Sequence, residues 1–289
     1  MKDILVTGGA GFIGSHLCEA LIQAGMYKVT SLDNYSTGSS KNHINGVRYV
    51  CGEVEDICTL IDFAPNIVFH LGEYARVEQS FEDIDIVYRS NKIGIFEVLE
   101  FCRKNGSKII YAGSSTKFGD GGLGRNQSPY AWTKATNTEL VINYAKWFNI
   151  QYAITYFYNV YGPREIGTGK YATLIGIFKE KMLKGQKLSI VSPGTQRRNF
   201  THVSDIVSGI MLVGEAGFGD DFGIGSQTSY SILEVATMFG GVIEMVPERA
   251  GNRMSAELLI KKICELGWQE QHALSEYIDS MRINNWLSE

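Results

Sequence analysis

The sequence predicts an α/β protein built on a doubly wound parallel sheet, with a smaller C-terminal lobe. Short apolar runs alternate with helical patterns through the first half of the chain, and a glycine-rich turn follows the first of these runs. The apolar runs are continuous, as in strands that are buried on both faces between layers of helices. With 289 residues, 44% of them hydrophobic, the chain is long enough for one large domain and an added lobe.

The expected elements follow in chain order. Hydrophobic periodicity, together with glycine and proline boundaries, separates the strands from the helices. Strands are predicted at 3–8, 27–34, 47–52, 66–72, 108–115 and 151–163, and helices at 11–25, 83–106, 129–148, 171–185, 204–216 and 231–241. The regular alternation stops after residue 163. The larger domain is therefore expected at 1–160, and the smaller substrate-binding lobe, structurally interleaved with it, at 161–289.

Charge and cysteine content argue against several classes of function. The net charge is −4, from 27 basic and 31 acidic residues, which suggests neither a nucleic-acid nor a membrane partner. The five cysteines form no C-x-x-C pair and the five histidines show no ligand spacing, so no metal site is predicted. Glycines interrupt the first apolar segment and no apolar run reaches membrane-spanning length, so a cytoplasmic location is expected.

The segment TGGAGFIG, residues 7–14, stands where the first strand becomes the first helix. In a dinucleotide-binding turn, Gly8 allows the sharp bend, Gly11 lets the backbone approach a pyrophosphate, and Gly14 lets the helix pack against the strand. This context predicts a dinucleotide cofactor at the turn.

Asp33 ends the next strand, about 20 residues after the turn, where an acidic residue completes the dinucleotide pattern. A carboxylate there accepts hydrogen bonds from both ribose hydroxyls and repels a 2′-phosphate, which favours NAD over NADP. Asn34, Ser36 and Thr37 are then expected near the adenosine end. The other interpretation of Asp33 is a carboxylate that only caps a turn.

Tyr130 and Lys134 lie one helical turn apart in SPYAWTK, where a serine and a proline signal the start of a helix. A free tyrosine hydroxyl titrates near ~10, so a tyrosine base at neutral pH needs its pKa lowered by roughly 3, which is about 4 kcal/mol. A lysine ammonium and a positive nicotinamide ring together provide such a field. Ser114, at the carboxyl end of the preceding strand, is the expected third member, because open sheets bind ligands at that edge.

With these residues the chain resembles the extended short-chain dehydrogenase/reductase superfamily, in its branch of nucleotide-sugar epimerases and dehydratases. The resemblance covers nearly the whole chain and rests on TGGAGFIG, LDN, HLGEYARVEQS, Asn91, AGSSTKFG, YAWTK, YNVYGP, RRNFTHVSD, RAGNR and LGW. It implies a Rossmann-like fold, NAD held across the sheet edge, and removal of a hydride from a sugar ring carbon, usually carbon 4.

The resemblance also implies roles for single residues. Tyr130 is the base, Ser114 shares the hydrogen bond to the sugar hydroxyl, and Lys134 tunes Tyr130 and holds the cofactor ribose. The residues expected to bind NAD are Gly8, Gly11, Phe12, Ile13, Gly14, Asp33, Asn34, Ser36, Thr37, Glu53, Val54, Leu71, Gly72, Asn91, Tyr130 and Lys134.

The partner molecule implied by the resemblance is a nucleotide-diphosphate sugar. Its diphosphate is expected on the smaller lobe, at Asn159, Arg198 and Arg249, because guanidinium groups suit a diphosphate. Relatives commonly pair through helices near 83–105 and 129–148, which implies a homo-oligomer, either a dimer or a larger assembly such as a tetramer.

The chain departs from this family at several positions. Family dehydratases carry an Asp-Glu pair directly after the Ser or Thr, but Ser115 and Thr116 stand there, so elimination of water is not expected. Glu73 replaces a small residue in the turn after the fourth strand, next to the expected nicotinamide. The segment DGGLGRNQSP at 120–129 is shorter than the loop that covers the sugar in the family, which indicates a roomier pocket or one closed by another subunit.

Oxidation at carbon 4 leaves two outcomes open. If the keto sugar leaves, the enzyme is a dehydrogenase whose NADH needs an outside oxidant, for which 2-keto acids are candidates. If the keto sugar is reduced on its other face, the enzyme is a 4-epimerase for a UDP- or GDP-sugar. The altered sugar pocket favours the dehydrogenase. The segments at 70–83 and 112–141 resemble a subgroup from bacterial capsular polysaccharide pathways that modifies GDP-heptose. A non-catalytic dinucleotide-binding protein is disfavoured, because Ser114, Tyr130 and Lys134 are all present.

Overall fold

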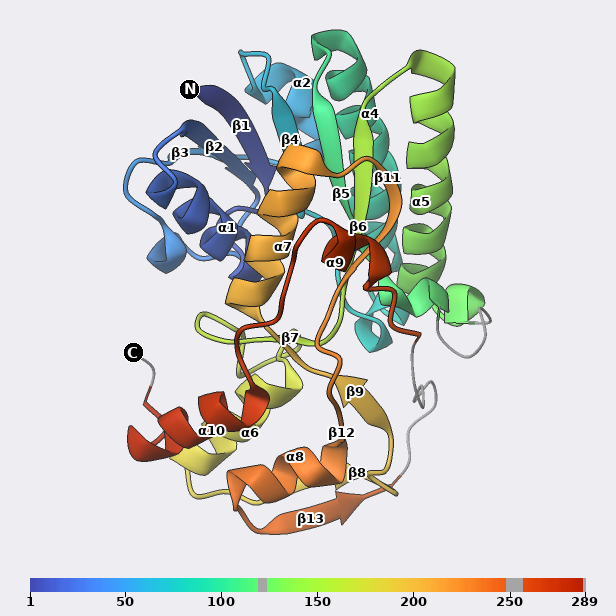
Figure 1. The fold of residues 1–289 in the computed structure, drawn as a ribbon. Coiled ribbons are helices and arrows are strands. Elements are labelled where there is room, and N and C mark those ends of the chain that lie inside the picture. Colours follow the sequence, from blue (N-terminus) through green and yellow to red (C-terminus); the bar gives the residue numbers. More distant parts are fainter. Residues whose placement is uncertain (119–123, 248–256, 288–289) are drawn as a thin grey trace.

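The computed structural model describes residues 1–118, 124–247 and 257–287, in which seven strands form one parallel sheet (Figure 1). The order across the sheet is β11-β6-β5-β4-β1-β2-β3, and every neighbouring pair is parallel. The strands are β1 (Lys2–Thr7), β2 (Tyr27–Asp33), β3 (Arg48–Cys51), β4 (Ile67–His70), β5 (Lys108–Ser114), β6 (Tyr152–Phe157) and β11 (Gly219–Ile224). The predicted doubly wound, Rossmann-like sheet is confirmed.

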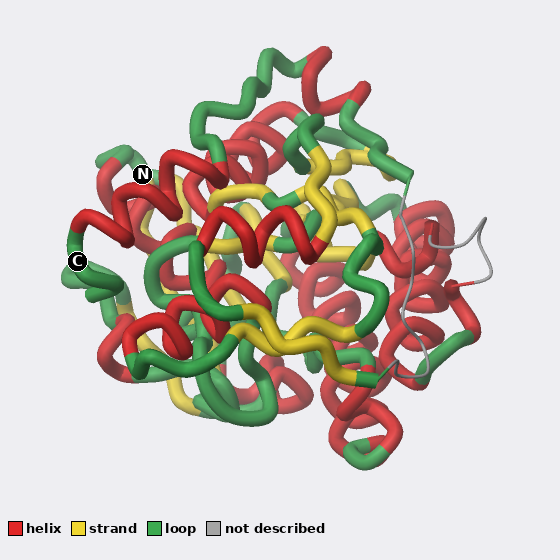
Figure 2. Tube along the Cα trace, turned by 90° about the horizontal axis from the view of Figure 1, so that it is seen from below, coloured by secondary structure: helices red, strands yellow, loops and turns green. Residues whose placement is uncertain are grey.

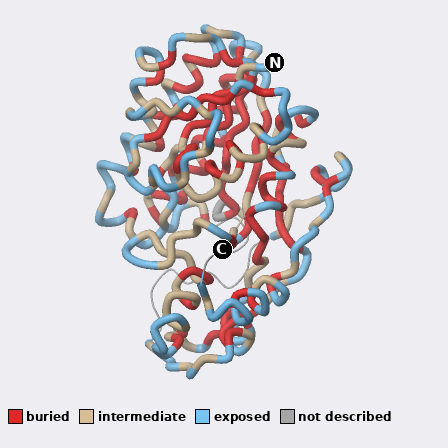
Figure 3. Tube along the Cα trace, turned by 90° about the vertical axis from the view of Figure 1, so that its left-hand side faces the viewer, coloured by how far each residue is buried: buried red, intermediate tan, exposed pale blue. Residues whose placement is uncertain are grey.

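Helices cover both faces of this sheet. Residues alternate along each strand, so Ile4 and Val6 of β1 pack with α1 (Phe12–Gln23) and α7 (Val203–Ala216). Leu5 faces the opposite side, where α2 (Ile57–Leu60), α4 (Gly94–Asn105) and α5 (Pro129–Phe148) lie. Figure 3 shows that the buried segments concentrate in these strands.

The predicted helix at 83–106 is one irregular helical segment. It consists of α3 (Ile84–Tyr88), a π-helical turn at Arg89–Ile93, and α4, which ends at Gly106 with φ +66°. A left-handed glycine is a common helix end. Asn91 lies in the π-helical turn, and such turns often mark functional positions.

The smaller lobe is built around its own core, which includes Phe178, Val235 and Ile278. Its elements are α6 (Leu174–Leu183), β8 (Leu188–Val191), α8 (Ile232–Phe239), β13 (Ile243–Val246) and α10 (Leu274–Ile283). Figure 2, which looks from below, has the helices and the β8–β13 ribbon of this lobe in the foreground. The sequence predicted the helices at 171–185 and 231–241 close to these bounds.

Two further strand pairs join the lobe to the sheet layer. They are β7 (Val160–Tyr161) with β10 (Thr201–His202), and β9 (Arg197–Asn199) with β12 (Ser229–Ser231). The chain returns to the large sheet twice. After β10 it forms α7 and β11, and after the smaller-lobe strand β13 it forms the short helix α9 (Lys261–Glu265), which packs beside β11. Among the described helices, none has both the length and the apolar character needed to cross a membrane.

Candidate active site

The glycine turn joins β1 to α1 at the carboxyl edge of the sheet. Gly8 has φ +76°, a conformation that side chains rarely adopt, and a Cβ there would lie 3.0 Å from the Cα of Gly72. A Cβ on Gly14 would lie 2.0 Å from the carbonyl oxygen of Gly8. Gly8 makes the predicted bend, and Gly14 allows α1 to approach the glycine turn itself, whereas the sequence predicted a close approach of the helix to the strand.

The N-terminus of α1 opens toward a cavity. Gly11 is the residue before the helix, and no described side chain caps the backbone N–H groups at this end. Phe12 and Ile13 line the cavity beside it. Uncapped N–H groups and the positive end of the helix dipole suit an anion, so this end fits the pyrophosphate of a dinucleotide.

Asp33 is buried at the end of β2, and its two carboxylate oxygens are both engaged with backbone. One accepts the N–H of Ala10 at 2.9 Å and the other accepts the N–H of Tyr35 at 2.8 Å. A carboxylate has about four acceptor positions, so two are left for ribose hydroxyls. The structure therefore has Asp33 bracing the turn, with acceptor positions left over on its carboxylate.

The residues expected at the adenosine end lie close to Asp33. The side chain of Asn34 donates to Glu53 at 2.9 Å and accepts the backbone N–H of Ser36 at 3.0 Å. Val54 follows Glu53 in a short helical turn after β3, and Thr37 follows Ser36 in the loop after β2. This brings the ends of β2 and β3 together at one side of the glycine turn.

Leu71 and Gly72 follow β4, the strand next to β1. Gly72 donates its backbone N–H to the hydroxyl of Thr7 at 3.0 Å, which fixes this turn beside the glycine turn. Asn91 is fully buried, and its side-chain amide accepts the N–H of Tyr74 at 2.8 Å and donates to the carbonyl of Tyr74 at 3.1 Å. Asn91 therefore holds the loop after β4, in addition to the cofactor contact expected for it.

The expected proton-transfer residues are brought together. Ser128 caps α5 by accepting the N–H of Ala131 at 3.0 Å, and this fixes the first turn of the helix. The hydroxyl of Tyr130 donates to Oγ of Ser114, at the end of β5, at 3.1 Å. Lys134 lies one turn further along α5, and all three side chains are buried.

Lys134 has a partner that the sequence did not predict. Its ammonium donates to the carbonyl of Ala112 at 2.5 Å and forms an ion pair with the carboxylate of Glu73. Glu73 also accepts from the hydroxyl of Tyr111 at 3.0 Å and from the amide of Asn137 at 3.1 Å. Burial alone would raise the pKa of Glu73, but the Lys134 ammonium and His70 at the end of β4 hold this pKa below its ordinary value.

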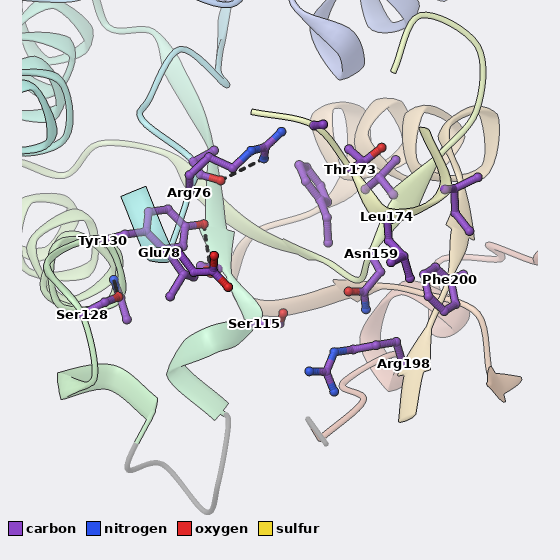
Figure 4. A pocket seen from close by; sticks show the side chains of 18 of the residues that line it. Arg76, Glu78, Ser115, Ser128, Tyr130, Asn159, Thr173, Leu174, Arg198 and Phe200 are labelled. Carbon is purple, nitrogen blue, oxygen red and sulfur yellow. Dashed lines mark hydrogen bonds between the residues drawn. The ribbon is translucent and has the colours of Figure 1, made fainter. Parts of the chain in front are cut away.

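A cavity of about 560 Å³ is lined by Ser114 and Tyr130 on the sheet side and by residues of the smaller lobe. Figure 4 shows Tyr130, Arg76 and Glu78 on one side of it, opposite Asn159 and Arg198. The sequence predicted Ser114, Tyr130, Asn159 and Arg198 for this place. It did not predict the lining by Arg76, Glu78, Thr173, Leu174 and Phe200.

Some expected features lie outside the described residues. Arg249 is one of them, and so are residues 120–123 of the shortened segment before Tyr130. Two later residues of that segment, Gln127 and Ser128, line the cavity. Among the described residues, no group of three His, Cys, Asp or Glu side chains is placed to hold a metal ion.

The parallel sheet, the glycine turn and the Ser–Tyr–Lys site define an enzyme of the extended short-chain dehydrogenase/reductase type. The chain belongs to the NAD dependent epimerase/dehydratase family, which matches residues 4–225. The prediction of NAD as the cofactor is confirmed at the level of the family.

Two proteins of similar sequence have related names. A protein of Methanocaldococcus jannaschii, provisionally named UDP-glucose 4-epimerase, is 34% identical over 303 aligned positions and covers 98% of both chains. The UDP-N-acetyl-alpha-D-glucosaminuronate decarboxylase of Bacillus cytotoxicus is 32% identical, over 81% of this chain and 78% of its own.

Two solved structures have the same fold along almost their whole length. The UDP-glucose 4-epimerase of Thermotoga maritima, solved with UDP-glucose, has a TM-score of 0.88 and 29% identity, over 98% of this chain and 99% of its own. The UDP-glucose 4-epimerase of Thermus thermophilus, solved with NAD, has a TM-score of 0.88 and 26% identity, over 98% of both chains.

Proposed function

We propose that the protein is a nucleotide-sugar 4-epimerase that acts on a UDP-sugar and keeps its NAD bound during turnover. The observation that carries the proposal is the hydrogen bond from Tyr130 to Ser114 at the wall of a cavity that both lobes line. Such a pair binds one hydroxyl group and moves its proton. The relatives named UDP-glucose 4-epimerase support the sugar nucleotide and the reaction.

The residues divide the chemistry at carbon 4 between them. Ser114 and Tyr130 both hydrogen-bond the carbon 4 hydroxyl, and the phenolic oxygen of Tyr130 takes its proton while the C–H bond at carbon 4 breaks. NAD, when bound, supplies the acceptor for the hydride. The keto sugar would turn over in the cavity, and Tyr130 would return the proton to the carbon 4 oxygen, with the bound cofactor supplying the hydride to the other face. Substrate and product therefore differ only in the configuration at carbon 4.

The smaller lobe, residues 161–289, is proposed to hold the nucleotide diphosphate. Arg198 lines the cavity from β9, opposite Tyr130. Asn159, with φ +37°, lines the same wall, and its side chain donates to the carbonyl of Asn199 at 3.2 Å. Arg249 belongs to the same proposal. A guanidinium that meets a diphosphate forms charge-assisted hydrogen bonds, which fix the sugar end near Tyr130.

Net oxidation of a GDP-heptose for capsular polysaccharide has less support. That alternative needs an external oxidant such as a 2-keto acid, whereas epimerisation restores the oxidised cofactor in each cycle. The relatives named as UDP-glucose 4-epimerases favour epimerisation. Ser115 stands where family dehydratases carry an acid, which keeps dehydration disfavoured.

A homo-oligomer is part of this proposal, as is a cytoplasmic location. Helices α3, α4 and α5 carry large apolar side chains that are exposed in the single chain, among them Ile84, Tyr88, Phe96, Trp147 and Phe148. Contiguous exposed apolar patches usually mark interaction surfaces. We propose that these helices pair with the same helices of a second copy.

The test begins with the small molecule released from heat-denatured protein, whose ultraviolet spectrum distinguishes NAD from NADH. The protein is then incubated separately with UDP-glucose, UDP-N-acetylglucosamine and a GDP-heptose, and the products are followed by NMR. The proposal expects interconversion of 4-epimers without net NADH. Accumulation of NADH with a keto sugar, discharged by 2-keto acids, would instead establish the dehydrogenase.

Two variants on helix α5 complete this test. Tyr130→Phe should slow interconversion by about 10²- to 10⁴-fold while NAD still binds, because the proton acceptor is lost. Tyr144→Phe, which removes a hydroxyl bonded to Glu100 away from the cavity, should leave the rate near that of the wild type. Equal rates for wild type and Tyr130→Phe would contradict the proposed role of Tyr130.

A further inference from the structure

The ammonium of Lys134 has a built-in counterion. The carboxylate of Glu73 pairs with Lys134, and the two side chains are 2% and 6% exposed. Glu73 follows β4, whereas Lys134 belongs to α5, so the contact joins two segments that are far apart in the chain. An exposed ion pair of this kind contributes little, but a buried one fixes the positions of both groups.

The surroundings of Glu73 are arranged for a charged carboxylate. Lys134 and Asn137 face it from α5, Tyr111 from β5, and Nε2 of His70 from β4 at 3.5 Å. A second cation reaches the cluster from the π-helical turn, where Lys92 donates to Asn137 at 2.8 Å. A buried carboxylate is costly unless several donors satisfy it, and Lys134, Tyr111 and Asn137 donate to this one.

The ion pair with Glu73 weakens the stabilisation that Lys134 gives to the phenolate form of Tyr130. A positive charge near a phenol stabilises the phenolate, and a negative charge beside that cation offsets the effect. Two of the three donor positions of the ammonium are taken, one by Glu73 and one by the carbonyl of Ala112. The field that Lys134 exerts at Tyr130 is therefore weaker than that of an unpaired lysine. The segment after β4 brings two further charged residues, Arg76 and Glu78, to the same side of the cavity as Tyr130, and a substitution at Glu73 leaves both in place.

We propose that Glu73 is a positioning residue that fixes the ammonium of Lys134 and, by offsetting its charge, raises the pH above which Tyr130 acts as a base. The inference rests on the proposed role of Tyr130. In the forward step the sugar hydroxyl gives its proton to Tyr130, and in the return step Tyr130 gives it back. A Tyr130 that keeps its proton to higher pH supports the return step and limits the forward step at low pH.

The direct test is an ultraviolet titration of tyrosinate in the NAD-loaded protein. The difference between the wild type and Tyr130→Phe isolates the ionisation of Tyr130. Burial, with Glu73 as a further cause, raises the pKa of Tyr111 well above its ordinary value, and the difference between matched proteins with and without the Tyr130 hydroxyl removes the Tyr111 signal. The same difference is then measured with Glu73→Gln, whose amide oxygen still accepts from Lys134 but carries no charge.

In Glu73→Gln the midpoint should fall by about one pH unit, which is a tenfold change in the ionisation constant. The acidic limb of kcat/KM for epimerisation should move to lower pH by the same amount. Glu73→Ala is the second neutral variant, with a small side chain as is common in the family, and should shift both readouts in the same direction. Glu73→Asp, which keeps the charge, should stay near the wild type.

The matched control is Glu139→Gln, which removes a carboxylate from the exposed face of the same helix and should move neither readout. An unchanged or higher midpoint in the folded neutral variants overturns the inference. If the midpoint falls but the wild type epimerises no sugar, the inference stands and the proposed function fails. If the wild type epimerises and neither readout moves, the proposed function stands and the inference fails.

Discussion

The carboxylate of Asp33 accepts the backbone N–H of Ala10 at 2.9 Å, across the gap between the end of β2 and the glycine turn. The same side chain holds Tyr35 at 2.8 Å through its other oxygen. One residue therefore fixes the shape of the turn and also presents the acceptors expected to bind the ribose.

Asp33→Asn should weaken NAD binding by about 10- to 100-fold, because hydrogen bonds to a charged acceptor contribute about 1.5–3 kcal/mol. NADP should lose less, since the variant no longer repels the 2′-phosphate. Titration calorimetry with both cofactors measures the ratio of their affinities. Asp62→Asn, at an exposed carboxylate, is the control. An unchanged ratio would mean that Asp33 serves only to brace the turn.

Arg198 and Arg197 are neighbours on β9 and offer a matched pair. Arg198 lines the cavity, whereas Arg197 pairs with Glu234 at 3.1 Å on the exposed side. Arg198→Ala should raise the KM for the UDP-sugar by about 10- to 100-fold, from the loss of charge-assisted hydrogen bonds to the diphosphate. Arg197→Ala should leave KM close to the wild-type value. Steady-state kinetics of both variants decide the matter, and equal KM values would remove Arg198 from the proposed diphosphate site.

Glu165 is partly buried and accepts the hydroxyl of Thr173, a residue that lines the cavity. Burial raises its pKa to about 7 from 4.5. A carboxyl group whose pKa is raised in the folded state stabilises the fold below pH ~4.5, and this stability is lost as the pH rises to about 7.

Glu165→Gln should therefore abolish part of the pH dependence of stability. Between pH 4 and pH 8 the wild type should lose roughly 3 kcal/mol of unfolding free energy relative to the variant. Urea unfolding at both pH values measures it, with the exposed Glu276→Gln as the control. A difference independent of pH would show that the pKa of Glu165 is the same in the folded and unfolded states.

Trp147 is 64% exposed near the end of α5, and Ile283, at the end of α10, is 80% exposed on the other lobe. If α3, α4 and α5 form the contact between two copies, Trp147→Glu should weaken dimerisation, because it places a charge in an apolar interface. Ile283→Glu should not. Sedimentation velocity over a range of concentrations gives the result. Two variants with identical association would place the interface elsewhere.

The sequence predicted the features that depend on local pattern. The strands β1 to β6, the helix start at Ser128 and the bend at Gly8 each follow from residues within one short segment. Ser114 and Tyr130 were predicted to meet because both belong to elements whose ends share the carboxyl edge of the sheet. The observed hydrogen bond of 3.1 Å between them agrees with this prediction.

Other features depend on packing between distant segments. The ion pair of Glu73 with Lys134 needs the turn after β4 to face α5 across β5, and no local pattern encodes that arrangement. The departure at Glu73 was visible in the sequence as a carboxylate in place of a small residue. The lining by Thr173 and Phe200 likewise depends on how the smaller lobe sits over the sheet edge.

The seventh strand, β11, was not predicted at all. Its sequence, GDDFGI, contains two aspartates and two glycines and has no continuous apolar run. It is a strand because it pairs in parallel with β6, and Phe222 and Ile224 then enter the core beneath α7.

The late position of β11 in the chain affects how the protein folds during its synthesis on the ribosome. The edge strand β11, and helix α7 that covers part of one face of the sheet, are made only after the first elements of the smaller lobe, α6 and β8, have been synthesised. At about 5–20 residues per second, the earlier strands wait for several seconds with the β6 edge unpaired and the face beneath α7 covered only in part, by α1. Chaperone dependence should therefore be greatest for nascent chains that end between β6 and β11.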